Sequence, residues 1–219
     1  MPAHRKKLKI EGANLWYLVG LITSDGNLSK DGRHIDITAK DFEFLRSVRA
    51  GVRIKNKIGI KNKGTNKQAY RFQISNKNFY DFLLSLGLTP HKSLTLGRLA
   101  VPDTYFVDFL RGLIDGDGCI RKWIHPSNNG EQWSIRIYSG SPKFIRWLKN
   151  IIESLLKIRG KLYKQGKSLL ILKYGKMAAI EIAKKCYYKS CLSMERKRNL
   201  ARECFGSYRG WNKSKTVFN

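Results

Sequence analysis

Residues 18–26 read LVGLITSDG, and residues 110–118 read LRGLIDGDG. Both copies hold leucine, glycine, leucine, isoleucine, aspartate and glycine at the same places, and the offset between the copies is constant. An apolar helical stretch that ends in a carboxylate and a glycine, and that occurs twice, indicates two similar halves facing each other. We therefore expect a site to which each half contributes one acid, Asp25 and Asp117.

The charge of the chain indicates a polyanionic partner. Its 219 residues hold 43 lysines and arginines and 16 acids, which gives a formal net charge of +27 at pH 7. The hydrophobic content of 42% is near the globular average, so we expect a folded chain. Because so much like charge opposes compaction, nucleic acid is the first candidate partner and an anionic membrane the second.

The membrane alternative has little support in the sequence. No apolar run approaches the roughly 18 residues that would span a bilayer, so no membrane partner is expected. The four cysteines form no pair of C-x-x-C clusters, and we interpret them as reduced thiols. These features predict an intracellular protein, either in the cytoplasm or nucleoid of a prokaryote or in an organelle.

Both halves show the same order of predicted elements: helix, two strands, helix, two strands, helix. In the first half Asn14 is the expected N-cap of the motif helix. Gly26 is expected to end this helix in a left-handed C′ conformation. Asp31-Gly32 predicts the turn of the first hairpin. The predicted division is a first repeat at 1–88, a linker at 89–103, a second repeat at 104–205 and a basic tail at 206–219.

The clearest predicted strands have one apolar face and one hydrogen-bonding face. In residues 34–38, for example, Ile35 and Ile37 alternate with Asp36 and Thr38. A polar sheet face can be a solvated surface, which is its commonest role. In a chain with this charge, we expect it instead to lie in a major groove and contact base edges. The alternation in 169–174 is ambiguous, so we predict no contacts there.

Sequence recognition is expected from the polar faces of the two halves. The residues predicted to contact DNA are Asn27, Ser29, His34, Asp36, Thr38, Lys57, Lys61, Arg71 and Gln73 in the first half, and Arg121, Trp123, Arg136, Tyr138, Lys161, Tyr163 and Gln165 in the second. Arginine and lysine pair best with guanine, glutamine with adenine, and Asp36 can accept from cytosine. Because the two sets differ, the predicted target is asymmetric. The loops 61–67 and 122–132 are expected to reach flanking base pairs.

The motif helices predict a metal site. Gly20 and Gly112 lack side chains, which lets two helices approach closely. Asp25 and Asp117 then stand at helix C-termini, where the macrodipole disfavours a carboxylate, and each raises the pKa of the other. Mg²⁺ suits a site with few carboxylates plus water and phosphate oxygens, and it can activate water beside a scissile phosphate. We expect Mn²⁺ to substitute for Mg²⁺, and Ca²⁺ to support binding without cleavage.

The doubled phrase resembles the LAGLIDADG signature of homing endonucleases, and a chain with two copies resembles their single-chain, pseudo-dimeric members. The resemblance covers roughly residues 14–200. It implies an α+β fold of two tandem αββαββα repeats with pseudo-two-fold symmetry, each an antiparallel, saddle-shaped sheet backed by helices. It also implies a monomeric, site-specific DNA endonuclease of the intron-homing type. Such an enzyme hydrolyses both strands across the minor groove and leaves short 3′ overhangs.

The resemblance also implies roles for positions within the motif. The eighth position carries the metal-binding acid, which is Asp25 in one copy and Asp117 in the other. The seventh offers a backbone carbonyl to the metal, here from Ser24 and Gly116. The sixth is acidic only in the second copy, as Asp115, and is expected to shape the helix end without binding metal.

A lysine late in each half is a further implied active-site group. Lys92 and Lys197 stand at corresponding places and are the candidates. A polar residue of the second strand maps near Ala39 in one half and Ser139 in the other, so the two sites are expected to differ in rate.

The sequence leaves a second hypothesis open. The same scaffold can belong to a non-cleaving nucleic-acid-binding protein, either an RNA maturase or a regulator. Retention of both acids favours cleavage, because a protein that only binds has no chemical need for either.

Overall fold

The computed structural model describes residues 10–61, 68–90, 92, 94–166 and 168–207. The elements of the first repeat are α1 (Gly12–Asp25), β1 (Gly26–Leu28), β2 (His34–Ala39), α2 (Phe42–Gly51), β3 (Ile58–Lys61), β4 (Ala69–Ser75) and α3 (Lys77–Ser85). Those of the second are α4 (Phe106–Asp115), β5 (Gly118–Ile124), β6 (Glu131–Ser139), α5 (Pro142–Leu156), β7 (Lys161–Gln165), β8 (Leu169–Tyr174) and α6 (Lys176–Cys186). A short 3₁₀ helix, Asp103–Tyr105, precedes α4, and α7 (Glu195–Gly206) follows α6.

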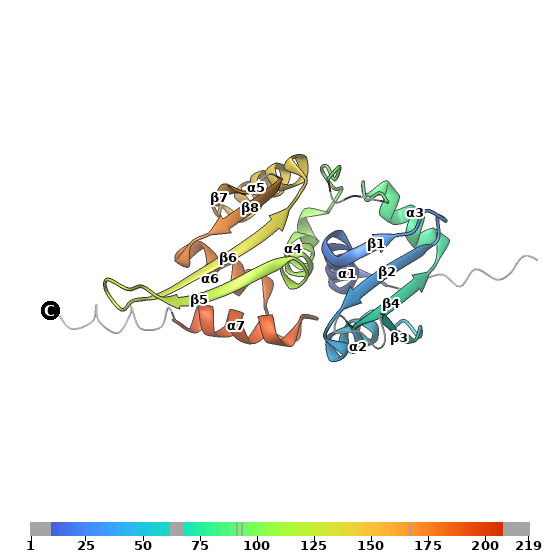
Figure 1. Cartoon of the computed structure of the whole chain (residues 1–219), viewed down its shortest axis with the longest axis horizontal. Coiled ribbons are helices and arrows are strands. Elements are labelled where there is room, and N and C mark those ends of the chain that lie inside the picture. Colours follow the sequence, from blue (N-terminus) through green and yellow to red (C-terminus); the bar gives the residue numbers. More distant parts are fainter. Residues whose placement is uncertain (1–9, 62–67, 91, 93, 167, 208–219) are drawn as a thin grey trace, which may run out of the picture.

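Each repeat contains one four-stranded antiparallel sheet. The strand order is β1-β2-β4-β3 in the first and β5-β6-β8-β7 in the second, so the two orders correspond (Figure 1). The predicted α+β fold of two tandem αββαββα repeats is confirmed. Helix α7 is an addition that the predicted order of elements did not include.

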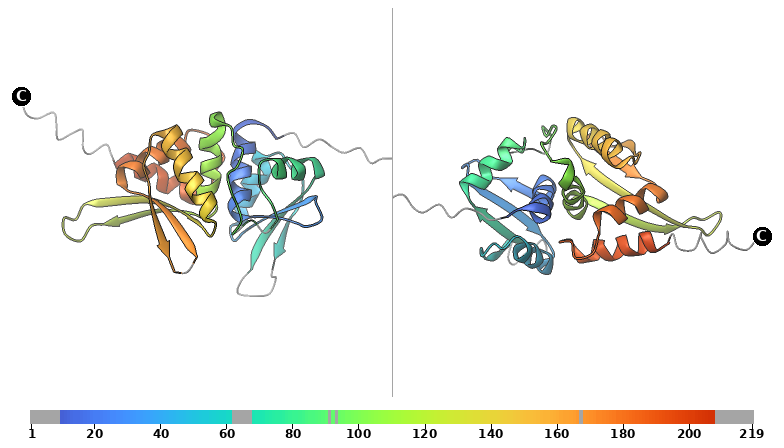
Figure 2. Two further views of the ribbon diagram at one scale, coloured as in Figure 1. Left: turned by 90° about the horizontal axis from the view of Figure 1, so that it is seen from above. Right: turned by 180° about the vertical axis from the view of Figure 1, so that it is seen from behind.

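The helices lie on one side of the molecule, and the two sheets lie on the other (Figure 2). In β2, Ile35 and Ile37 are fully buried against the helices, whereas Asp36 and Thr38 are only half-buried. In β4, Phe72 is likewise fully buried. The predicted alternation is therefore correct, and each sheet has an inner face that forms core and an open face free of helices.

Helices α1 and α4 run side by side through the centre of the molecule (Figures 1 and 2). A Cβ built on Gly20 would lie 2.1 Å from the carbonyl oxygen of Phe109, and one on Gly112 would lie 2.2 Å from that of Tyr17. No side chain fits at either position, so the two backbones are in direct contact. This contact joins the repeats and places the last residues of both motif helices together.

Two predictions about the ends of α1 are wrong. The helix begins at Gly12, and Asn14 lies inside it, where its side-chain amide donates to the Gly51 carbonyl at 2.9 Å. Gly26 is extended (φ −85°, ψ 153°) and not left-handed, because the chain passes directly from α1 into β1. Glycine is needed there for space, since a Cβ would lie 2.6 Å from the Ile22 Cα. The predicted turn at Gly32 is correct (φ 74°).

The described parts of the segment between α3 and the 3₁₀ helix contain no helix or strand, and Lys92 lies in this segment. Across the described ranges, no helix is long and apolar enough to cross a bilayer. The four cysteines are all free thiols.

Candidate functional site

The acids of the two motif copies meet at the C-terminal end of the α1–α4 contact. A Cβ built on Gly116 would lie 1.9 Å from the Ser24 hydroxyl oxygen and 3.1 Å from Asp25 Oδ2. The carboxylate of the first copy therefore lies against the backbone of the second. The two copies differ at motif position seven for this reason, because the serine side chain of one occupies space that the glycine of the other leaves.

The electrostatics of this place disfavour two ionised carboxylates. Burial first, and the nearby Asp117 second, raise the pKa of Asp25 to about 6. Burial also raises the pKa of Asp117. Lys92 and Lys197 lie close enough to oppose both increases. The two acids thus form a site that gains stability from a further cation.

The donor set fits a hard divalent cation. Among the described residues, no group of three or more histidine, cysteine or acidic side chains could hold a metal ion. The pair Asp25 and Asp117 would therefore need other oxygens, from backbone, water or phosphate, to complete a coordination shell. An all-oxygen set with few carboxylates is typical of Mg²⁺.

Lys197 belongs to the first turn of α7 and is only 4% exposed, and its side chain reaches the C-terminal end of α4. Its ammonium donates to the carbonyls of Ile114 at 2.6 Å, Asp115 at 2.7 Å and Gly116 at 3.0 Å. These carbonyls are ones that a helix end leaves without helical partners, so Lys197 acts as a cationic cap. Burial lowers the pKa of its ammonium.

Lys92 reaches the same region from the connector between the repeats. It is 7% exposed, and its ammonium donates to the carbonyl of Gly26, directly after the first motif acid. Burial lowers its pKa to about 8, against the attraction of Asp117 and Asp25. The two predicted lysines therefore both lie beside the acids, but they contact different parts of the two motifs.

A small cavity of about 100 Å³ opens beside Asp117. Lys92, Ser24 and Ser139 contribute to its lining, so the structure brings the polar residue of the second strand to the second acid. The cavity has room for more than one water molecule. Ala39, at the matching place in the first repeat, is half-buried and offers no polar side chain.

The predicted contact residues of the first sheet lie on or beside its open face. Directly paired residues share a face, and Asp36 pairs with Asn27 on one side and Gln73 on the other. Thr38 pairs with Arg71, and the remaining predicted positions are His34 at the start of β2, Lys61 at the end of β3, and Ser29 and Lys57 just outside β1 and β3. Residues 62–67 of the predicted contact loop lie outside the described residues.

The predicted contact residues of the second sheet also share its open face. Arg136 lies on the inner strand β6, between its directly paired residues Cys119 of β5 and Lys173 of β8. By the same alternation this face carries Arg121, Trp123, Tyr138, Lys161, Tyr163 and Gln165. It also carries Leu169, Ile171 and Lys173, which the ambiguous alternation of β8 left unassigned. Lys122 of the predicted 122–132 loop is directed away, toward Glu131 at 3.1 Å and Glu203 at 3.4 Å.

The two open faces differ in how their charges are paired. In the first sheet, the Gln73 amide donates to Asp36 Oδ1 at 2.9 Å, and Arg71 Nε lies 4.0 Å from the same oxygen. In the strands of the second sheet, every charged side chain on the described open face is basic. There Arg136 Nε is buried without a hydrogen-bond partner in the described structure. On the second face Arg121 and Lys173 lie over the rings of Trp123 and Tyr163, and the described strand residues include no acid beside them. The first face instead carries a prearranged polar group.

A comparison with models of protein families found a match that lies in the second repeat. Residues 106–201 match the family model of the LAGLIDADG-like domain. No curated protein matches the sequence.

Solved structures share the fold of the whole chain. The meganuclease I-SmaMI, bound to uncleaveable DNA, is 12% identical over 95% of this chain and 93% of its own, with a TM-score of 0.61. The homing endonuclease I-WcaI, bound to its DNA recognition sequence, is 12% identical over 88% and 87%, with a TM-score of 0.63. Full-length DUF199/WhiA from Thermatoga maritima is 13% identical over 96% and 71%, with a TM-score of 0.58. The fold is that of two-motif homing endonucleases, and WhiA has it too.

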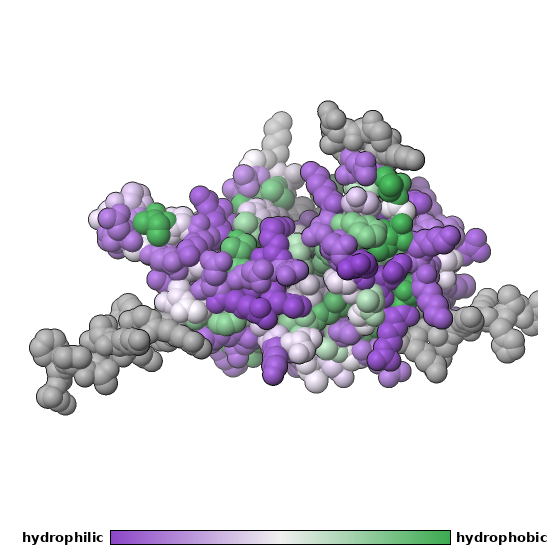
Figure 3. All heavy atoms as spheres, turned by 90° about the horizontal axis from the view of Figure 1, so that it is seen from below, coloured by the Kyte–Doolittle hydropathy of each residue, from purple (hydrophilic) through white to green (hydrophobic). Residues whose placement is uncertain are grey.

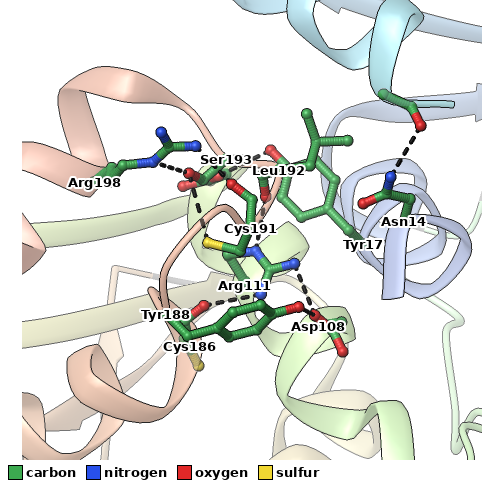
Figure 4. A network of polar contacts seen from close by, with 12 residues as sticks. Asn14, Tyr17, Asp108, Arg111, Cys186, Tyr188, Cys191, Leu192, Ser193 and Arg198 are labelled. Atoms are coloured by element: carbon green, nitrogen blue, oxygen red, sulfur yellow. Dashed lines mark hydrogen bonds and ion pairs between the residues drawn. The ribbon is translucent and has the colours of Figure 1, made fainter. Parts of the chain in front are cut away.

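Sequence reasoning missed a buried polar network where α1 and α4 meet the segment before α7 (Figure 4). Arg111 and Asp108 of α4 form an ion pair of 2.8 Å, and the ring of Tyr17 from α1 lies against the guanidinium. Asp115, assigned only to the helix end, accepts from the Tyr17 hydroxyl at 2.8 Å. The available signal was Arg111, a basic residue at motif position two, where the first copy has Val19.

Proposed function

We propose that this protein is a metal-dependent, site-specific endonuclease that cuts both strands of a long, asymmetric DNA target. The observation that carries the proposal is the meeting of Asp25 and Asp117 at the end of the α1–α4 contact. Folding alone gives no reason to bury two carboxylates at helix C-termini, since burial, dipole and mutual repulsion all oppose it. A bound cation and a phosphate backbone supply the reason.

The residues around this point have separate roles in the proposal. Asp25 and Asp117 would hold Mg²⁺, with the backbone carbonyls of Ser24 and Gly116 as further oxygens. A metal held there would supply Lewis-acid chemistry, by which a water is activated and the leaving oxygen of the phosphodiester is stabilised. Lys92 and Lys197 place positive charge beside the acids, which favours ionised carboxylates and attracts the scissile phosphates. The Gly116 carbonyl already accepts from Lys197, and its second lone pair leaves capacity for another partner.

The sheets supply binding and recognition in this proposal. Their open faces lie on one side of the molecule, and the net charge of +27 favours a phosphate backbone (Figure 2). The face of α2 and α7 also carries mostly hydrophilic side chains (Figure 3). By resemblance, the sheets occupy the major groove and cleavage crosses the minor groove to leave short 3′ overhangs. The structures of I-SmaMI and I-WcaI, which share the fold and are bound to DNA, support a DNA partner. For the whole protein, we further propose that it acts as a monomer inside the cell.

A second candidate function is nucleic-acid binding without cleavage. The likeness to DUF199/WhiA supports it, because that protein has the same fold and its name does not describe a nuclease. The fold therefore does not discriminate between the two candidates. The pair of acids does, and it favours the endonuclease.

The test begins with a randomised duplex pool, from which the protein selects its target in Ca²⁺. The selected duplex is then incubated with the protein in Mg²⁺ or in Ca²⁺. We expect binding in both and cleavage of both strands in Mg²⁺, whereas binding in both with intact DNA in Mg²⁺ would establish the second candidate. D25N and D117N are expected to bind without making double-strand cuts. D81N, which changes an exposed acid of α3, serves as the control.

A further inference from the structure

The second motif copy holds a buried charge that the first lacks. Arg111 occupies motif position two and is 0% exposed, and the matching residue of the first copy is Val19. Removing a guanidinium from water is costly unless nearly all of its donors find partners. An apolar side chain satisfies the packing at the same place in the first repeat. Arg111 therefore has a role beyond filling space.

The guanidinium binds both ends of the segment that joins α6 to α7. Its Nη1 donates to the Cys186 carbonyl at 2.8 Å, and its Nε donates to the Leu192 carbonyl at 2.8 Å. Nη2 donates to Asp108, also at 2.8 Å, and the ring of Tyr188 lies 5.0 Å from the guanidinium carbon. Figure 4 shows these groups converging on Arg111 from α4 and from the segment. The segment is thus attached to the motif helix.

One helical turn further on, Asp115 attaches the same segment again. Its carboxylate accepts from the Tyr187 hydroxyl at 2.7 Å and from the Met194 backbone amide at 2.7 Å. Met194 is the N-cap residue of α7, so this contact determines where α7 begins. Because Arg111 and Asp115 lie four residues apart, they share one face of α4.

The contacts decide where Lys197 lies, because Lys197 is in the first turn of α7. Its ammonium must reach three carbonyls at the end of α4, all within 3.0 Å. In the described residues of the first repeat, the motif helix has no arginine and no acid at the positions that correspond to Arg111 and Asp115. Its motif position two is Val19, and Thr23 at position six donates back to the Val19 carbonyl at 2.7 Å.

We propose that Arg111 is a positioning residue that holds α7 so that Lys197 stands beside one of the two scissile phosphates. The inference rests on the proposed function, because it assumes that Lys197 assists cleavage. Lys92 arrives from the connector and does not depend on Arg111. Loss of Arg111 therefore slows cleavage of one DNA strand and leaves the other unchanged.

The test compares D108N/R111M with the unaltered protein. This double variant removes both charges of the buried ion pair between Arg111 and Asp108. The asparagine side chain that replaces Asp108 keeps an oxygen for the Tyr188 hydroxyl, which donates to Asp108 at 2.7 Å. Single-turnover cleavage is measured on the selected duplex, with each strand labelled separately. We expect one strand to slow by roughly 10- to 100-fold, since small displacements of a catalytic group have effects of that size. R202M changes an exposed arginine of α7 and is the matched control.

A double-mutant cycle distinguishes positioning from general damage. If Arg111 acts through Lys197, adding D108N/R111M to K197M produces no further loss on the slowed strand. Equal slowing of both strands, no slowing, or losses that add in the cycle would each overturn the inference.

Amide hydrogen exchange gives a readout that needs no cleavage. Residues 187–198 of D108N/R111M are expected to exchange about tenfold faster or more, the effect of losing one hydrogen bond to a charged group. Exchange in α2 and α3 is expected to be unchanged, and unaltered exchange in 187–198 would refute the positioning role. If the unaltered protein does not cut, the proposed function fails, and the exchange result still decides whether Arg111 holds α7.

Discussion

The contact between α1 and α4 allows a quantitative prediction for G20A. The added methyl would lie 2.1 Å from the Phe109 carbonyl oxygen and 3.1 Å from the Gly112 Cα. Both neighbours are backbone atoms, so no change of rotamer relieves the overlap. The helices must separate by about 1 Å to restore an ordinary contact.

The expected effect on stability combines two opposing contributions. Overpacking costs about 3 kcal/mol at the upper end of its usual range, and alanine regains about 1 kcal/mol of helix propensity over glycine. The net loss of about 2 kcal/mol corresponds to a Tm lower by about 4–8 °C for a protein of this size. Thermal unfolding followed by circular dichroism measures this change.

The expected effect on cleavage is larger than the effect on binding. Separation of the helices moves Asp25 away from Asp117, and a displacement of about 1 Å can lower a rate by about 100-fold. The sheets remain intact, so affinity in Ca²⁺ is expected to change little. G206A is the control, because a Cβ at Gly206 meets no atom within 4 Å. If G20A is as stable and as active as the unaltered protein, the helices are not in direct contact and the reasoning is wrong.

Three further predictions concern the sheets and the buried network. D36N removes the one acid among the open-face residues of the first sheet, so it should bind random duplex more tightly and lose a preference for cytosine at one position in a binding selection. R136Q and K173Q should each reduce the salt dependence of DNA binding, as measured by titration at several salt concentrations, with the slope falling by about one for each phosphate that the side chain no longer neutralises. Y17F removes a hydroxyl that donates to the buried Asp115, so denaturant unfolding should show a loss of about 1–3 kcal/mol.

Local patterns predicted much of the fold. The alternation in β2 and β4 assigned their faces correctly, because side chains of a strand point alternately to opposite faces. The same rule failed for β8, which reads LLILKY and is apolar on both faces, so only its pairing with β6 places Lys173 on the open side. Capping rules failed at Gly26, because contact with Ile22 and not a left-handed backbone requires glycine there.

The sequence by itself determined that the chain has two related halves, that each ends a motif helix with an acid, and that the protein is strongly basic. These features lie in short stretches or in composition, so they can be read without coordinates. Only the tertiary structure decided how Lys197 reaches the end of α4 and what Arg111 binds, because those contacts join residues about 80 positions apart. The repeated phrase specifies the helix seam, and long-range packing makes its two ends chemically different.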